Sequence, residues 1–273
     1  MNTKTNNLIV RMLSGAVYVA LMVLSVFYEW VAYALFTFLT ITALFEYKNI
    51  GEKIIPGFKG SLSFLLSAAL CVPVIMRFAA FGNPYSIFAA ACLFTLSLFL
   101  PSLLMKSERP LESLGLSLFS QAWIVLPLTV LFTLWIPQAP EAVLAFFILI
   151  WASDTFAYLG GSLFGKHKLA ERISPGKTWE GFAIGTAMTA GLAVALNYVP
   201  FFRYAGMELW QWIVFAIIVE VFGLIGDLTE SLFKRQAGIK DSGKIIPGHG
   251  GVLDRLDSIF LATIPAAIFS FCC

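Results

Sequence analysis

The chain has 273 residues, of which 59% are hydrophobic and only 12% are charged, and its mean hydropathy is +0.85. Soluble domains average about 45–50% apolar and about 25% charged residues, so this chain has too few polar side chains to cover a particle in water. The composition excludes an ordinary soluble protein and predicts an all-α polytopic integral membrane protein. The net charge of +2 says little about partners, and we expect no nucleic-acid partner.

Nine apolar stretches approach the length of about 20 residues that a helix needs to cross the hydrocarbon. Glycine and proline residues typical of turns separate most of them. We therefore predict about nine transmembrane helices. In chain order, the predicted spans are 8–28, 30–45, 61–78, 84–105, 116–136, 141–164, 179–199, 210–233 and 253–273.

The positive charges support this count. When loops are assigned alternately to the two sides, all but two of the 18 Lys and Arg residues fall on the side of the N-terminus. The exceptions are Arg77 and Arg203. Because Lys and Arg concentrate in cytoplasmic loops, we predict a cytoplasmic N-terminus in the plasma (inner) membrane. The two most basic loops, after spans six and eight, then share the cytoplasmic face.

We divide the chain by sequence into three regions. Residues 1–110 hold the first four spans, residues 111–150 form a middle transmembrane region, and residues 151–273 form a C-terminal transmembrane region. The last region contains the stretch 231–258, which combines both charges and glycine more densely than any other stretch of this length.

Three aspartates from three different predicted spans lie at similar depth. By helical rise, Asp154 and Asp227 fall about 20 Å and about 25 Å along spans six and eight, which both run inward. Asp257 falls about 24 Å from the outer end of span nine. Ionisable groups at this depth usually face a water-filled cavity or a partner. The three acids therefore predict a site in a cavity that opens to the cytoplasm.

Helical spacing groups further polar residues with these acids. Asp254 and Asp257 are three residues apart and share one helix face, and Glu230, Ser231 and Lys234 share a face with Asp227. Carboxylate oxygens suit Mg²⁺ better than Zn²⁺. The alternative is that the acids merely neutralise the basic residues of the stretch 231–258, which include Lys234, Arg235 and Arg255.

Two glycine-containing loops accompany the acids. In SPGKTWEG (174–181), Pro175 and Gly176 predict a turn that places Lys177 at the start of span seven. Such a helix start can bind an anion, although a simple capped helix explains the sequence equally well. His249 lies among glycines and either donates to a phosphate oxygen or stabilises the turn.

The stretch 231–258, SLFKRQAGIKDSGKIIPGHGGVLDRLDS, resembles the signature of the phosphatidate cytidylyltransferase (CDP-diacylglycerol synthase) family. The Ser153–Asp154 pair, the 174–181 loop and Asp227 are also similar to what this family carries. All fixed positions of the signature are occupied. They are Ser231, Phe233, Lys234, Arg235, Lys240, Asp241, Gly243, Ile246, Pro247, His249, Gly250, Gly251, Val252, Asp254, Arg255, Leu256 and Asp257.

The resemblance implies that phosphatidate attacks the α-phosphate of CTP, giving CDP-diacylglycerol and pyrophosphate. It implies Mg²⁺ held by Asp227, Asp254 and Asp257, a second ion such as K⁺ in a paired site, and a homodimer. Asp227, Lys234, Asp254 and Asp257 are the expected catalytic residues. The residues expected to bind substrate phosphates are Ser231, Arg235, Lys240, Asp241, His249 and Arg255, together with Lys177 and Asp154.

Two other functions stay open at this point. A lipid kinase acting on a polyprenol or phytol has similar hydropathy and shares parts of the motif. A secondary transporter coupled to an anion also holds acids in broken helices near the membrane midplane. Against the transporter, the predicted carboxylates lie towards one face and the sequence shows no inverted repeat.

The first prediction concerns Lys240. Lys240→Ala is expected to raise the Michaelis constant for CTP severalfold, because a charge-assisted contact to phosphate is lost, while the unfolding temperature stays near that of wild type. Steady-state kinetics at varied CTP measure the constant. An unchanged constant would leave Lys240 as a solvated surface cation.

Overall fold

The computed structural model describes residues 3–56, 58, 109–243, 245–248 and 250–273. It contains seven helices that are long and apolar enough to cross a membrane, and these coincide with seven of the nine predicted spans. The other two, 61–78 and 84–105, lie outside the described residues. The part of the chain that the structure describes is thus predominantly helical, consistent with the predicted all-α polytopic membrane protein.

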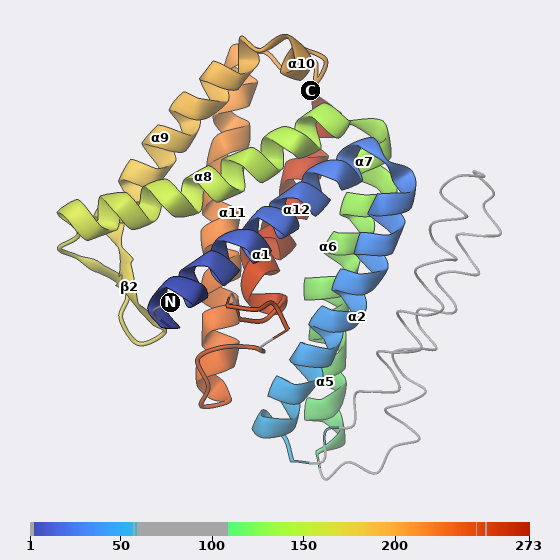
Figure 1. The fold of residues 1–273 in the computed structure, drawn as a ribbon, viewed down its shortest axis with the longest axis vertical. Helices are drawn as coiled ribbons and strands as arrows, with labels where there is room; N and C mark the ends of the chain where they lie inside the picture. Colours follow the sequence, from blue (N-terminus) through green and yellow to red (C-terminus); the bar gives the residue numbers. More distant parts are fainter. Residues whose placement is uncertain (1–2, 57, 59–108, 244, 249) are drawn as a thin grey trace. The chain divides into compact units, whose positions relative to one another are not determined.

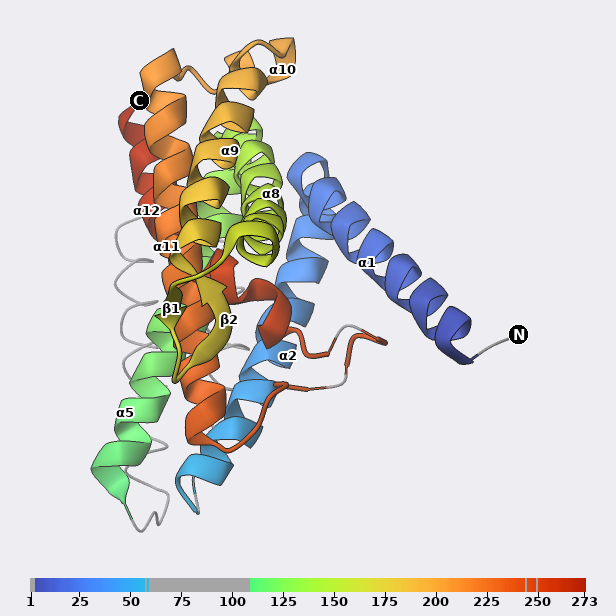
Figure 2. The ribbon, with the colours of Figure 1, turned by 90° about the vertical axis from the view of Figure 1, so that its left-hand side faces the viewer.

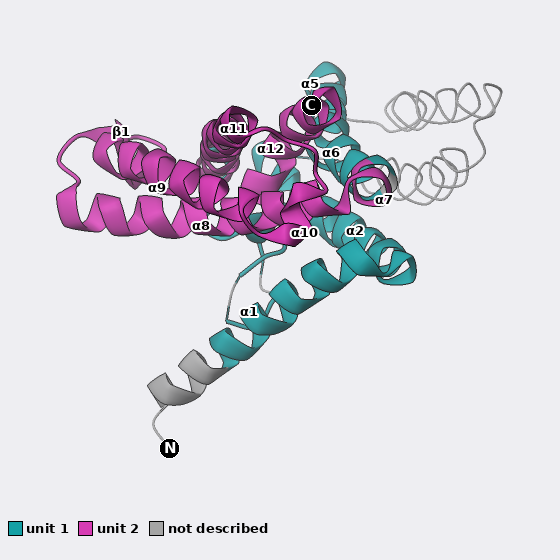
Figure 3. Ribbon diagram, turned by 90° about the horizontal axis from the view of Figure 1, so that it is seen from above, with its two compact units in different colours: residues 1–134, 236–255 teal, residues 135–235, 256–273 magenta. Residues whose placement is uncertain are grey.

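The chain divides into two compact units, coloured separately in Figure 3. Unit 1 comprises Met1–Leu134 and Gln236–Arg255. Unit 2 comprises Trp135–Arg235 and Leu256–Cys273. Each unit joins segments that are distant in sequence. The segment that connects the last two long helices belongs to unit 1.

In unit 1, helix α1 (Thr3–Phe27) is followed at once by α2 (Glu29–Ile54). Helix α2 extends nine residues beyond the predicted end of span two, and Lys48 and Glu52 of this extension form an i,i+4 ion pair on the helix surface. The extension places Glu46 and Tyr47 within the helix, and both are buried. The Tyr47 hydroxyl donates to the carbonyl of Leu116 at 2.9 Å.

A composite helical stretch follows the undescribed residues. It consists of α5 (Pro110–Ser120), η1 (Gln121–Val125), α6 (Leu126–Thr129), η2 (Val130–Trp135) and α7 (Ile136–Gln138). The segments η1 and η2 are π-helical, and Pro127 lies between them. Proline has no N–H to donate to the carbonyl four residues earlier, which is one reason for the wider turns on either side of it.

The remainder of unit 1 is the connector that leads from the end of α11 into α12. Its isolated bridge pairs Ile246 with Gly250, and the φ angles of Gly248 and Gly250 are +75° and +89°. Side chains with a Cβ rarely adopt such angles. The connector extends towards α1, as Figure 2 shows. There the Ser14 hydroxyl donates to the carbonyl of Pro247 at 2.9 Å.

Unit 2 is built from long helices and one small hairpin (Figures 1 and 2). Helices α8 and α9 pack closely because glycines line their contact. A Cβ added at Gly181 of α9 would lie 2.7 Å from the carbonyl oxygen of Ala157 in α8. Small residues allow this approach between membrane helices. The elements are α8 (Pro140–Phe164), β1 (Lys168–Ala170), β2 (Ser174–Thr178), α9 (Trp179–Asn197), α10 (Pro200–Arg203), α11 (Leu209–Gln236) and α12 (Leu253–Cys272).

The hairpin corrects one expectation. Pro175 and Gly176 do not form the turn; they lie in strand β2, and the turn is at 171–173. Strands β1 and β2 pair antiparallel, with Lys168 opposite Thr178. Proline is tolerated because a two-stranded ribbon has only edge strands. Thr178 then caps α9 by accepting from the backbone N–H of Gly181 at 3.1 Å.

The second prediction tests the contact between α11 and α12 in unit 2. A Cβ at Gly226 of α11 would collide with the carbonyl oxygen of Asp257 and lie 3.2 Å from the Cα of Ser258. Gly226→Ala is therefore expected to destabilise the protein by about 1–3 kcal/mol, the usual cost of overpacking. Thermal unfolding in detergent measures the change.

Gly191→Ala is the matched control, because a Cβ at this position of α9 meets nothing within 4 Å. Its unfolding temperature should equal or exceed that of wild type, since alanine is the better helix former. Equal unfolding temperatures for Gly226→Ala and wild type would contradict the close packing of α11 on α12.

Candidate functional site

The centre of the candidate site in unit 2 is Asp227 on α11. The Nζ atom of Lys177, at the end of β2, lies 2.5 Å from Oδ2 of Asp227. The hydroxyl of Ser231, one helical turn further along α11, donates to Oδ1 at 3.2 Å. Both side chains of the ion pair are about three-quarters buried. The hairpin thus brings Lys177 to a helix that begins more than thirty residues later in the chain.

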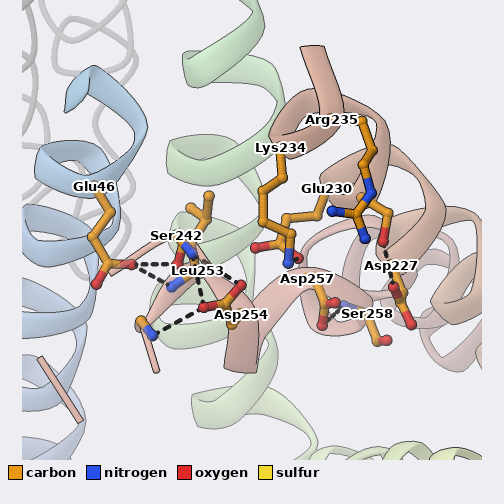
Figure 4. A network of polar contacts seen from close by, with 12 residues as sticks. Glu46, Asp227, Glu230, Lys234, Arg235, Ser242, Leu253, Asp254, Asp257 and Ser258 are labelled. Carbon is orange, nitrogen blue, oxygen red and sulfur yellow. Dashed lines mark hydrogen bonds and ion pairs between the residues drawn. The ribbon is translucent and has the colours of Figure 1, made fainter. Parts of the chain in front are cut away.

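Two further carboxylates interact with this pair. Asp257 on α12 is half-buried and interacts electrostatically with Asp227, Asp154 and Lys177. Its Oδ1 also accepts a hydrogen bond from the backbone N–H of Ser258 at 2.7 Å, as Figure 4 shows. The structure therefore brings together the three acids of spans six, eight and nine.

This arrangement has the chemistry of a cation site. Asp227 and Asp257 both interact with the ammonium group of Lys177, and Asp154 interacts with Asp257, so the carboxylates of this group outnumber its ammonium. An all-oxygen donor set of this charge fits Mg²⁺. Among the described residues, no group of three or more His, Cys, Asp or Glu side chains already has the spacing of a coordinated ion. Instead, the ammonium of Lys177 pairs with one oxygen of Asp227.

The end of α11 carries two more of the predicted residues. Lys234 is largely buried, and its Nζ lies 2.6 Å from Oε2 of Glu230, which is 1% exposed (Figure 4). Arg235 is exposed, and its Nε donates to the carbonyl of Ile173 at 3.3 Å. Since Ile173 belongs to the turn of the hairpin, Arg235 links the hairpin to α11 in addition to the Lys177–Asp227 pair.

Unit 1 contains the remaining predicted residues. Asp254, in the first turn of α12, accepts from the backbone N–H groups of Ser242 and Gly251, each at 3.0 Å to Oδ2. This carboxylate therefore joins the two ends of the connector. Lys240, Asp241 and Arg255 have exposed side chains. His249 lies outside the described residues.

Sequence reasoning missed two buried carboxylates. Glu46 of α2 accepts three hydrogen bonds in unit 1 and is 2% exposed. Glu220 of α11, also 2% exposed, is hydrogen-bonded to Ser153 and Thr189 in unit 2. A carboxylate inside an apolar run signals a functional or paired position. Glu220 lies inside predicted span eight, so the sequence could have indicated it. Glu46 lies just after the predicted end of span two, so its position in the sequence carried no such indication.

Comparison with known proteins identifies relatives of the chain. One is the phosphatidate cytidylyltransferase of Haemophilus influenzae, 45% identical over 128 residues, which are 46% of this chain and 44% of that protein. The phosphatidate cytidylyltransferases of Staphylococcus saprophyticus and Staphylococcus aureus (strain COL) are 49% and 47% identical over 119 residues, 44% of each chain. These alignments span a little under half the length of each relative.

The match to a whole family is more extensive. Residues 9–273 correspond to the cytidylyltransferase family. This range includes the helices that carry Asp154, Asp227 and Asp257, the hairpin with Lys177, and the connector before α12. The correspondence covers nearly the full sequence, and we conclude that this chain belongs to the cytidylyltransferase family.

Proposed function

We propose that the protein is a CTP-dependent phosphatidate cytidylyltransferase, which converts CTP and phosphatidate into CDP-diacylglycerol and pyrophosphate. The observation that carries this proposal is the group formed by Lys177 and the acids Asp154, Asp227 and Asp257. The complete signature at 231–258 and the relatives named phosphatidate cytidylyltransferase support the same substrates.

The reaction needs the chemistry that these residues offer. Phosphatidate is a phosphate monoester whose second pKa is about 6, so it is largely ionised near neutral pH and needs no strong general base. The requirement is instead to align two anionic substrates and to neutralise their charge. Lys177 and Lys234 supply ammonium groups from the hairpin and α11, and Ser231 supplies a hydroxyl donor. Lys240 is an exposed cation available to the triphosphate.

The acids are proposed to hold a divalent cation. Asp227 and Asp257, with Asp254 three residues before Asp257 on α12, are the proposed Mg²⁺ ligands, and a second ion such as K⁺ completes a paired site. When bound, Mg²⁺ supplies charge neutralisation to the nucleotide phosphates. Asp154 interacts with Asp257 and thereby adds to the negative charge that attracts the ion.

The proposal also covers topology and assembly. CTP comes from the cytosol and phosphatidate from the membrane, so the site must be open to water on the cytoplasmic side and to lipid. We therefore propose nine spans with a cytoplasmic N-terminus in the inner (plasma) membrane, a catalytic region at 151–273, and a homodimer. The asymmetric distribution of Lys and Arg supports this orientation.

The third prediction tests the activity. Purified protein with radiolabelled CTP, phosphatidate and Mg²⁺ is expected to yield a labelled, lipid-soluble product, and a chelator should abolish it because the carboxylates then lack their cation. Thin-layer chromatography against CDP-diacylglycerol identifies the product.

Two outcomes would contradict the proposal. Phosphorylation of dolichol or phytol without any CDP-diacylglycerol would make the protein a lipid kinase. Flux of a labelled anion into proteoliposomes without nucleotide turnover would make it a transporter.

The fourth prediction concerns the carboxylates. Asp227→Asn and Asp257→Asn are each expected to lower turnover by about 100-fold or more, because an oxygen ligand and a negative charge are lost together. Size-exclusion chromatography and thermal unfolding should show a folded protein of unchanged size. Glu112→Gln, at the exposed start of α5, is the control and should retain full activity. Near-normal turnover of either aspartate variant at saturating Mg²⁺ would remove that residue from the metal site.

A further inference from the structure

A buried carboxylate of α2 organises the connector before α12. Oε1 of Glu46 accepts from the backbone N–H of Val252 at 3.1 Å, and Oε2 accepts from that of Leu253 at 2.9 Å. Oε2 also accepts from the hydroxyl of Ser242 at 3.0 Å. Figure 4 shows Glu46 reaching from its helix to these groups. One side chain thus bonds both to the connector and to the start of α12.

The environment of Glu46 is specific for a carboxylate. Its side chain is 2% exposed and takes part in none of the ion pairs found among the described residues. The N–H groups of Val252 and Leu253 lie at the N-terminus of α12, where unsatisfied donors and the helix dipole stabilise negative charge. Backbone dipoles therefore stabilise the carboxylate of Glu46, and no described cationic side chain forms an ion pair with it.

Two glycines of the signature leave room for this carboxylate. A Cβ added at Gly243 would collide with Oε1 of Glu46, and one added at Gly251 would lie 2.5 Å from Oε2. Gly251 also donates its N–H to Asp254. These glycines are thus required for close packing around a side chain about 200 residues earlier in the chain.

Ser242 connects Glu46 to a proposed metal ligand. Its hydroxyl donates to Glu46, while its backbone N–H donates to Asp254. Both carboxylates therefore hold the same residue of the connector. Asp257 follows Asp254 by three residues on the same helix. A shift of the first turn of α12 would move Asp254 and change the direction in which Asp257 projects.

Helix α1 adds a second support to the connector within unit 1. The hydroxyl of Ser14 donates to the carbonyl of Pro247, and that of Tyr18 donates to the carbonyl of Arg255 at 3.3 Å. Ser14 and Tyr18 are four residues apart and share a helix face. The first two helices thus contact the connector and the first turn of α12 at several positions from Ser242 to Arg255.

We infer that Glu46 is a positioning residue for the proposed nucleotidyl transfer: it fixes the connector and the first turn of α12 so that Asp254 and Asp257 are held for the cation. This inference rests on the proposed function. It assigns to α2 a role in the reaction, although that helix carries no part of the signature.

The fifth prediction compares three variants in the full-length protein. Glu46→Gln keeps the size of the side chain but replaces one acceptor with an amide donor, which leaves a buried N–H or hydroxyl without its partner. We expect kcat to fall about tenfold or more and the Mg²⁺ concentration for half-maximal activity to rise, with little change in the Michaelis constant for CTP. Steady-state kinetics at varied CTP and Mg²⁺ provide the three values.

Tyr47→Phe is the structural control. It removes a different buried hydrogen bond of α2, the one to Leu116, and should lower the unfolding temperature while leaving kcat and the Mg²⁺ requirement near wild type. Glu52→Gln, on the partly exposed face of the same helix, should change neither. If Tyr47→Phe and Glu46→Gln alter kcat and the Mg²⁺ requirement equally, Glu46 is only a structural residue and the inference is wrong.

A measurement independent of activity separates this inference from the proposed function. In hydrogen–deuterium exchange, peptides that cover residues 242–253 should exchange faster in Glu46→Gln than in Tyr47→Phe, since the N–H group of either Val252 or Leu253 loses its acceptor. Unchanged exchange would overturn the positioning role even if the wild type is active. If the wild type has no cytidylyltransferase activity, the proposed function fails, while faster exchange still shows that Glu46 orders the connector.

Discussion

The compensation of charge inside apolar helices is the constraint on which this structure depends. Lipid cannot solvate an ionised side chain, so each such group needs a partner within the protein or contact with water. Asp227 pairs with Lys177, and Glu230 pairs with Lys234. Glu46 uses backbone N–H groups at the start of α12 instead. The first and third of these contacts connect segments that are distant in sequence, whereas Glu230 and Lys234 pair within α11.

Close packing makes these pairings possible. Hydrogen bonds and ion pairs act over about 3 Å, so the backbones that carry the partners must come near one another. The absence of a side chain at Gly226 allows α12 to pack closely on α11 next to Asp227. Gly181 likewise allows α8 to pack closely on α9, directly after the hairpin that carries Lys177. Gly243 and Gly251 leave space for the Glu46 carboxylate to contact the connector. Glycine therefore occurs where charged groups have to meet as well as where the chain turns.

Much of the fold follows from local sequence. Apolar length predicted the seven membrane helices of the described residues, and their ends differ mainly where a charged residue was taken as the end of a span. The predicted end of span two directly precedes Glu46, whereas α2 continues to Ile54 and carries the Lys48–Glu52 pair on its surface. The hairpin at 168–178 was not predicted, because its strands are short and Pro175 and Gly176 favour a turn.

By itself, the sequence determined the membrane class, the residues of the signature and the presence of acids in spans six, eight and nine. It did so because apolar length and motif spacing are local properties of a chain. Only the tertiary structure decided which groups meet: Lys177 with Asp227, and Glu46 with the start of α12. Nothing near Glu46 in the sequence indicates Ser242 or Leu253, since such pairings arise only when distant helices pack.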